Sequence, residues 1–281
     1  MNQPYCKDLH IYWINRPLKE EEEKLLDDSF IGNWVEEEIS FLFFKRDARD
    51  ELEKLIQKDK GLKIIDYYKM SYEQWQGGFY EPIQIENIII IPPWQESSFP
   101  IPEKSIPIFL DPSVVFGNCL HPTTRHCISA ICYFMKRHND NAKSILDLGT
   151  GTGILAIVSA KLGADMVWAV DINPLCIKTA NKNFSRNSVL DKVRSVCISA
   201  QEAILKFSQA DLIIANLNYE VISQLMEIPQ FFRNSLILSG MLRSQWADIK
   251  YQLTKKGYRI VREWEEDMTW YSGLALKEVF A

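Results

Sequence analysis

The feature that most constrains this chain is the glycine-rich segment DLGTGTG at residues 147–153. A short apolar run at Ser144–Leu148 leads into it, and the residues from Ile154 to Leu162 have the composition of a helix. Glycines at alternate positions let the backbone turn tightly and leave no Cβ in the way of a ligand lying on the loop. A glycine loop between a strand and a helix is typical of nucleotide binding. The segment therefore predicts a site for a nucleotide-containing ligand.

Two classes of ligand fit this loop. Residues 151–156 (GTGILA) match the dinucleotide fingerprint G-x-G-x-x-A, and Asp171 follows twenty residues after Gly151. Asp147, at the end of the first strand, would repel a pyrophosphate but would accept a hydrogen bond from an ammonium group. S-adenosylmethionine carries an ammonium group and no phosphate, so Asp147 favours it as the cofactor. Asp171 suits a ribose diol in either ligand, because a carboxylate accepts two hydroxyl hydrogen bonds.

Strands and helices alternate from His121 onward, which is typical of βαβ crossovers and a parallel sheet buried on both faces. We expect strands at residues 144–148, 166–171, 193–198, 211–216 and 235–239, with helices at 124–136, 154–162, 173–187, 218–227 and 244–256. Two further strands, near 258–264 and 270–277, have no helix between them and should pair antiparallel at one edge. The predicted fold is therefore α/β, a Rossmann-like domain with a mostly parallel seven-stranded sheet and an antiparallel last strand.

A smaller unit precedes this domain. The patterns of residues 1–91 predict a small α+β fold: strands at Leu9–Asn15 and Gly61–Tyr68, a strand or hairpin at Asn33–Phe44, and helices at Leu18–Asp28 and Asp47–Lys60. Residues 92–107 contain five prolines, too many for a helix or a central strand. We therefore predict a substrate-recognition domain at 1–91, a proline-rich linker at 92–107 and a catalytic domain at 108–281.

Charge and cysteine content restrict the partners. The chain has 32 Lys and Arg against 37 Asp and Glu, a net charge of −5, with −8 in residues 1–110 and +3 in the remainder. An acidic front domain suits a basic protein partner better than a nucleic acid. The six cysteines form no C-x-x-C pair, so no metal site is expected. No segment has the pattern of a signal peptide or a membrane span, so we expect a cytoplasmic protein without a membrane partner.

Two residues are candidates for the acceptor side. Asn216 ends the predicted fourth strand, and polar side chains at the carboxyl edge of a parallel sheet face the binding crevice. An amide there would accept a hydrogen bond from an amine and orient it. Tyr219, on the first turn of the next helix, would contact the aliphatic stem of the acceptor or favour its cation. Both are predicted as catalytic residues.

Together these segments resemble a known family. DLGTGTG with Asp171, the IIANL run before Tyr219, the HPTT entry to a helix at 121–124, the PPW at 92–94 and the EQWQGGF at 73–79 look like the bacterial ribosomal protein L-eleven methyltransferases (PrmA). The resemblance covers nearly the whole chain. It implies a class I methyltransferase that uses S-adenosylmethionine, an amino group of a basic large-subunit ribosomal protein as acceptor, and an N-terminal domain that recognises this protein.

The resemblance also implies cofactor contacts by position: Thr124, Gly149, Gly151, Asp171 and Asn216, with Ala200 and Gln201 beside the adenine. One departure stands out. The family usually has a further glycine and a threonine in the stretch before HPTT, where this chain has residues 118–120 (NCL). We expect this loop to differ in shape or mobility. Two alternatives stay open, a methyltransferase of the same fold acting on another protein or a small molecule and, disfavoured by Asp147, an NAD(P)-dependent oxidoreductase.

Overall fold

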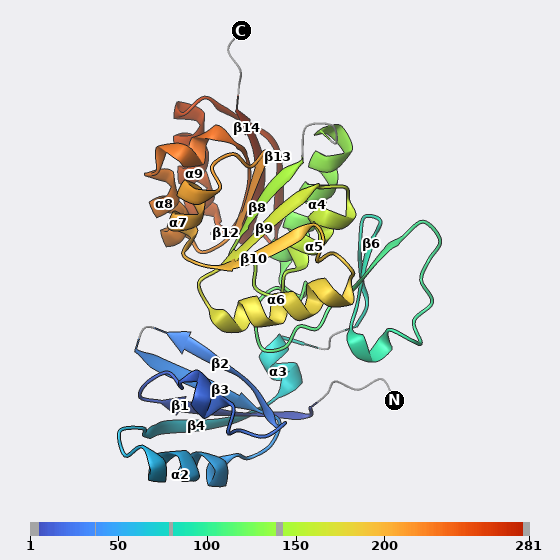
Figure 1. Ribbon diagram of the computed structural model, residues 1–281. Helices are drawn as coiled ribbons and strands as arrows, with labels where there is room; N and C mark the ends of the chain where they lie inside the picture. The colour runs from blue at the N-terminus through green and yellow to red at the C-terminus, as the bar shows by residue number, and fades with distance from the viewer. Residues whose placement is uncertain (1–5, 37, 79–80, 139–142, 278–281) are drawn as a thin grey trace.

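The computed structural model describes residues 6–36, 38–78, 81–138 and 143–277, and Figure 1 shows their arrangement. Phe79, the last residue of the EQWQGGF motif, lies outside the described residues. The strands form three sheets with four, seven and three members. The seven-stranded sheet positions the candidate site, and the other two sheets pack against the elements around it.

The seven-stranded sheet confirms the predicted fold class. Its strands are β8 (Ser144–Leu148), β9 (Met166–Asp171), β10 (Val193–Cys197), β11 (Leu212–Asn216), β12 (Ser235–Leu242), β13 (Tyr258–Glu266) and β14 (Trp270–Lys277). They lie in the order β10-β9-β8-β11-β12-β14-β13. The first five pair in parallel, and β14 lies antiparallel between β12 and β13. The order of the parallel strands reverses next to β8, which opens a crevice at their carboxyl ends.

Helices cover both faces of this sheet (Figure 1). One face carries α4 (Pro122–His138), α5 (Ile154–Lys161) and α6 (Pro174–Arg186), and the other carries α7 (Ala200–Lys206), α8 (Tyr219–Met226) and α9 (Arg243–Lys255). The short 3-10 helix η2 (Pro229–Arg233) joins the second face through buried Phe231 and Phe232. Seven of the eight residues of α5 are buried, because this helix lies inside the core behind the glycine loop.

The N-terminal sheet, as we call the four-stranded sheet, has the order β2-β3-β1-β4 and is antiparallel throughout. Its elements are β1 (Asp8–Ile14), α1 (Glu20–Glu23), β2 (Phe30–Glu36), β3 (Ile39–Phe44), α2 (Arg49–Lys58) and β4 (Ile64–Ser71). This is a β-α-β-β-α-β arrangement with β3 inserted between β1 and β2. The strand or hairpin predicted at 33–44 therefore corresponds to the antiparallel pair β2 and β3. The predicted helix at 18–28 is reduced to one turn, since none of its four residues is buried and it has no apolar face to pack.

The N-terminal sheet is covered on both faces. Tyr12, Leu42 and Leu52 belong to a core between the sheet and α2. On the opposite face, Leu9 and Phe43 pack with Val114 and Leu175 of the second half of the chain. The Asn173 side chain also donates to the carbonyl of Val35, with 3.3 Å between the atoms. The strand β2 therefore rests on the start of α6, directly beside the carboxyl end of β9.

The proline-rich segment connects two strands of one small sheet. Its members are β5 (Ile83–Ile85), β6 (Ile88–Ile91) and β7 (Ile106–Phe109), and η1 (Pro93–Gln95) lies in the connection. The strands β6 and β7 pair in parallel, and Ile88, Ile90 and Ile108 are buried in one core with α4 and α5. The predicted division into residues 1–91, 92–107 and 108–281 stays a prediction, and this sheet spans both of its limits.

No helix in the described part of the chain has the length and apolar character needed to cross a membrane. All six cysteines carry free thiols. The short helix α3 (Tyr72–Gln76) follows β4 directly and is capped by Ser71, whose hydroxyl accepts from the backbone of Gln74. From α3, the Tyr72 hydroxyl and the Gln76 amide both donate to the carbonyl of Ser113 at 2.7 Å, so this helix joins the N-terminal sheet to the segment before α4.

The buried side chain of Asn183 joins α6 to the segment at Asp111 and to the glycine loop at Thr152, and we predict that the stability of the fold depends on it. Its amide accepts from the backbone of Asp111 and donates to the carbonyls of Asp111 and Thr152, each at 2.9 Å. Asn183→Ala leaves these buried groups unpaired, so we expect the free energy of unfolding to fall by about 2–4 kcal/mol in urea titrations. The matched control is Asn181→Ala on the exposed side of the same helix, which should change it by less than about 0.5 kcal/mol. Equal effects of the two variants would contradict this assignment.

Candidate active site

The glycine loop turns sharply from β8 into α5. Gly149, Gly151 and Gly153 have φ angles of 71°, 53° and 84°, in the left-handed region that favours glycine. The amides of Gly149 and Thr150 donate to the carbonyl of Val170 at 2.8 and 2.9 Å, which holds the loop against the end of β9. A Cβ at Gly151 would overlap the carbonyl oxygen of Phe116. Glycine is therefore required there by a neighbouring protein segment, in addition to the room it leaves for a ligand.

Asp171 ends β9 and bonds to this loop. One carboxylate oxygen accepts from the amide of Gly151 at 3.0 Å, and the other accepts from the amide of Asn173 at 2.9 Å. The Cys176 thiol and the backbone of Ile172 also interact with this carboxylate. Burial raises the pKa of Asp171 above its ordinary value, although these hydrogen bonds oppose the shift. The carboxylate is thus held in a fixed orientation toward the crevice.

A cavity of about 570 Å³ opens at the carboxyl edge of the sheet, a size typical of small-molecule sites. We call it the cofactor cavity. It collects six of the predicted site residues: Gly149, Gly151, Asp171, Ala200, Gln201 and Asn216. Ala200 and Gln201 are the first residues of α7, where Ser199 forms a capping box with Glu202. The Gln201 amide donates to Gln224 of α8 at 2.8 Å, so the two helices form one wall.

Three predicted residues lie outside the lining of the cofactor cavity. Asp147 is fully buried behind the loop, and Thr124 is 1% exposed. The hydroxyl of Thr124 lies 3.5 Å from the amide nitrogen of Asn216, so it borders the cavity through that side chain. Tyr219 donates its hydroxyl to Asp248 of α9 at 2.9 Å and packs against the core beneath α8. The structure therefore brings Asn216 into the cavity and places Tyr219 beside α9.

Sequence reasoning missed several wall residues. Trp34, Phe116, His121, Leu217 and Trp270 line the cofactor cavity, and they come from segments far apart in the chain. The rings of His121 and Trp270 meet edge to face with 4.7 Å between their centroids. His121 lies in the HPTT motif and Leu217 ends the IIANL run, but by themselves these motifs indicate no more than the start of a helix and the end of a strand. Trp34 and Trp270 lie in strands without any local signal for a site.

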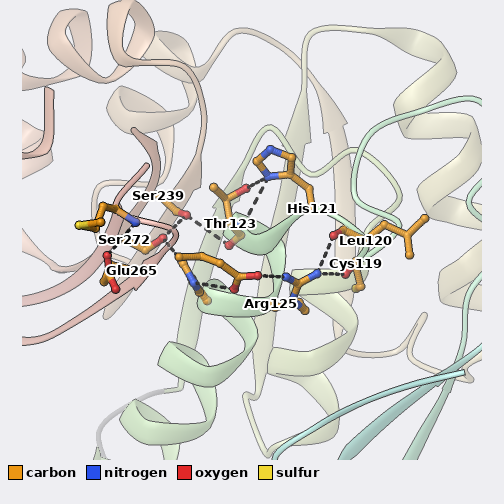
Figure 2. Close-up of polar contacts among 11 residues, drawn as sticks. Cys119, Leu120, His121, Thr123, Arg125, Ser239, Glu265 and Ser272 are labelled. Atoms are coloured by element: carbon orange, nitrogen blue, oxygen red, sulfur yellow. Dashed lines mark hydrogen bonds and ion pairs between the residues drawn. The ribbon is translucent and has the colours of Figure 1, made fainter. Parts of the chain in front are cut away.

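A polar network holds the loop before α4 (Figure 2). Arg125 donates to the carbonyl of Leu120 at 2.6 Å and to Glu266 of β13 at 2.7 Å. The His121 ring nitrogen lies 2.7 Å from the hydroxyl of Thr123. The hydroxyl oxygens of Ser239 and Ser272 lie 2.5 Å apart, and the Ser239 hydroxyl donates to the carbonyl of Thr123 at 3.2 Å. These bonds connect α4 to β12 and β14. This network positions His121 against the cofactor cavity.

The departure at residues 118–120 gives this loop contacts of its own. Cys119 adopts a φ of 68°, in the left-handed region that favours glycine. Asn118 donates to both the carbonyl and the side-chain oxygen of Gln76 at 2.8 Å, and its own oxygen accepts from the amide of Leu120 at 3.0 Å. These hydrogen bonds fasten the loop to α3, and the predicted difference from the family loop stays a prediction.

Comparison with known proteins identifies the family. The model of the family "Ribosomal protein L11 methyltransferase (PrmA)" matches residues 15–277. Curated proteins named "Ribosomal protein L11 methyltransferase" are similar to this chain, at 32% identity in Anoxybacillus flavithermus (89% of this chain, 78% of the relative) and 31% in Limosilactobacillus fermentum (72% and 62%). The match therefore spans less than two thirds of the second relative.

Solved structures agree with the match to this family. The crystal structure of a ribosomal protein L11 methylase from Lactobacillus delbrueckii subsp. bulgaricus is similar with a TM-score of 0.60 and 27% identity, covering 71% of this chain and all of that chain. A human methyltransferase 10 domain containing protein, with a TM-score of 0.50 and 18% identity over 60% of this chain and 88% of its own, supports the fold alone. The family model and the curated relatives together show that this chain belongs to the ribosomal protein L11 methyltransferase (PrmA) family.

Proposed function

We propose that the protein is an S-adenosylmethionine-dependent N-methyltransferase that modifies amino groups, on lysine or the chain terminus, of a large-subunit ribosomal protein. One observation carries this proposal: a single cavity at the sheet edge collects Gly149, Gly151, Asp171, Ala200, Gln201 and Asn216. The names of the relatives supply the substrate class. Such a reaction takes place in the cytoplasm, and we propose that neither nucleic acid nor membrane is a direct partner.

The walls of the cofactor cavity fit S-adenosylmethionine better than a dinucleotide. The described residues that line it include no Lys or Arg to neutralise a pyrophosphate, and they do include the Asp171 carboxylate. A carboxylate in this position suits a ribose diol as a hydrogen-bond acceptor. Ile172, which is 73% exposed, and Ile198 provide apolar surface near Ala200 for an adenine ring. A lining with the Asp171 carboxylate and, among its described residues, no Lys or Arg argues against the NAD(P)-dependent alternative.

In this proposal the protein acts mainly by positioning. S-adenosylmethionine supplies an electrophilic methyl group on a sulfonium. The Asn216 amide nitrogen lies near Thr124, which leaves its oxygen to accept from the amine and orient it. A lysine amine has an ordinary pKa of about 10.4, and the apolar walls Phe116 and Leu217 favour its neutral form by desolvation. No general base is required beyond solvent.

The direct test is methyl transfer to ribosomal proteins. The purified chain, incubated with tritiated S-adenosylmethionine and large ribosomal subunits from a deletion strain, should label one large-subunit protein. Mass spectrometry of that protein from wild-type and deletion strains should show the same methyl groups missing. Labelling of a different protein or only of a small molecule would favour the alternative methyltransferase, and stabilisation by a nicotinamide dinucleotide alone would favour the oxidoreductase.

We predict that Asp171 is required for cofactor binding. Asp171→Asn replaces one acceptor oxygen by a donor, so it disrupts the bond from Gly151 or Asn173 and the proposed ribose contact. Binding of S-adenosylhomocysteine in calorimetry should weaken at least about tenfold. Asp165→Asn, at an exposed residue directly before β9, is the matched control and should bind normally. Normal binding by both variants would refute the proposed site.

The two predicted catalytic residues are expected to differ. Asn216→Ala removes the proposed amine acceptor, and we expect kcat to fall at least about tenfold, more than the affinity for S-adenosylhomocysteine falls. Tyr219→Phe removes only the hydroxyl that donates to Asp248, so kcat should change less than about twofold if its role is packing. A large loss in the tyrosine variant, with normal thermal stability, would instead support the predicted catalytic role of Tyr219.

The buried carboxyl group of Asp147 leads us to a prediction about how the stability of the protein depends on pH. One of its oxygens accepts from the Thr150 hydroxyl at 2.6 Å, and the other has no hydrogen-bond partner in the described structure. Burial raises its pKa from 3.8 to about 7, so the folded state holds the proton more tightly than the unfolded state. This contribution to stability is greatest below pH of about 4 and is lost as the pH rises to about 7.

Asp147→Asn should therefore remove this part of the pH dependence without deleting the bond from Thr150. Urea titrations of the ligand-free protein should show the variant gaining stability relative to wild type as the pH rises from about 4 to about 7, with no further change above. A constant difference across this range would show that Asp147 stays ionised. Its predicted contact with the cofactor ammonium group remains a separate prediction.

A further inference from the structure

A second cavity, of about 720 Å³, lies between the N-terminal sheet and the loop before α4. We call it the interdomain cavity. Strands of the N-terminal sheet supply one wall, through residues such as Ile11 and Met70, and the loop from Val114 to Pro122 supplies the opposite wall. Trp34, Phe116 and His121 line both this cavity and the cofactor cavity. The two cavities are therefore neighbours that share a wall.

The walls of the interdomain cavity are rich in aromatic side chains. They contain six aromatic residues: Trp34, Phe41, Phe43, Tyr68, Trp75 and Phe116. The rings of Phe43 and Trp75 meet edge to face with 5.0 Å between their centroids. This wall offers apolar surface and aromatic faces, which attract cations as well as hydrocarbon.

The polar groups of the same walls bond within the protein. The Trp75 indole donates to the carbonyl of Val114 at 3.2 Å, and the Gln76 amide nitrogen donates to the carbonyl of Ser113 at 2.7 Å. The amide of Asn118 donates to Gln76. A neutral polar ligand such as a sugar would find few partners here, because these donors are already used.

The described lining of the interdomain cavity carries negative charge and no Lys or Arg. Among the described residues that line it, Glu36 is the only acidic residue and there is no Lys or Arg. Glu36 is exposed at the end of β2, where its carboxylate accepts from the Trp34 indole at 3.1 Å. Burial lowers the pKa of His121, which favours its neutral ring. An anion is therefore disfavoured, and a cation with an aliphatic stem is favoured.

We propose that the interdomain cavity is an acceptor subsite for an aliphatic ammonium group, the amine-bearing side chain or chain terminus of the polypeptide substrate together with its methylated forms. This inference rests on the proposed methyl transfer and names the part of the acceptor that the N-terminal sheet recognises. Glu36 attracts the cation, and Trp34 contacts it next to the cofactor cavity. Each added methyl group keeps the charge and adds apolar surface, so the subsite retains a partly methylated acceptor between transfers.

A binding experiment tests the subsite without catalysis. Two probes, Nα-acetyl-Nε-trimethyllysine amide and the neutral Nα-acetylnorleucine amide, are added to the full chain, and saturation-transfer NMR reports their binding. The trimethyllysine probe should bind about five- to tenfold more tightly than the norleucine probe. Trp34→Leu, which keeps an apolar side chain but removes the aromatic face, should abolish this preference. Trp264→Leu, on β13 and remote from the cavity lining, should keep it.

A kinetic experiment tests whether the charge of the Glu36 carboxylate contributes to acceptor binding. Glu36→Gln keeps an oxygen to accept from Trp34 but removes the charge, so KM for the ribosomal protein should rise about fivefold with kcat unchanged. Glu38→Gln makes the same charge change two residues away, on an exposed side chain outside the lining, and should leave KM unchanged. Equal effects of both variants would reduce Glu36 to a general surface charge and overturn its role in the subsite.

The two proposals fail in different ways. A chain that does not bind S-adenosylhomocysteine or transfer methyl groups refutes the proposed function, and the probe experiment can still be read because it needs no transfer. A chain that binds and methylates normally, but shows equal affinity for the charged and neutral probes, refutes the subsite alone. Trimethyllysine binding that Trp34→Leu and Glu36→Gln both leave unchanged places the cation elsewhere and also refutes it.

Discussion

The site depends on the way the glycine loop is fastened to the end of β9. The carbonyl of Val170 accepts two amides of the loop, and the Asp171 carboxylate accepts a third, from Gly151. These bonds join the ends of the neighbouring strands β8 and β9, beside the point between β8 and β11 where the strand order reverses, so the position of Asp171 and the shape of the loop are set together. A shift of either segment would disturb the cofactor cavity, because its floor is made of both.

The N-terminal sheet takes part in the site as well as preceding it. Its face packs with Val114 and Leu175, and Trp34 reaches the walls of both cavities. The bonds from α3 to Ser113 and from Asn118 to Gln76 fasten the same region from the other side. Recognition of the acceptor and positioning of the cofactor are therefore mechanically connected, since one loop, from Val114 to Pro122, borders both cavities.

Much of the larger domain could be predicted, because its signals are local. The alternation of strands and helices indicated a mostly parallel seven-stranded sheet, and the two last strands without an intervening helix indicated antiparallel pairing. The predicted helix at 18–28 was wrong in length, since propensity and charge indicate a helix but only a packed apolar face stabilises one. The proline-rich segment was predicted to be neither helix nor central strand. It contains no α-helix, but it includes the short 3-10 helix η1 and the start of the edge strand β7, and it joins two strands of one sheet, which its composition could not show.

What the sequence by itself determined is the chemistry that lies close along the chain: a glycine loop with positive φ angles, an acidic residue at each of two strand ends, and an amide at a third. Only the tertiary structure decided which of these face a ligand. It buried Asp147 behind the loop, turned Tyr219 toward Asp248, and brought Trp34 and Trp270 to the cavity from positions more than two hundred residues apart. The physical reason is that hydrogen bonds of a loop depend on neighbouring residues, whereas a cavity wall depends on how whole sheets pack against one another.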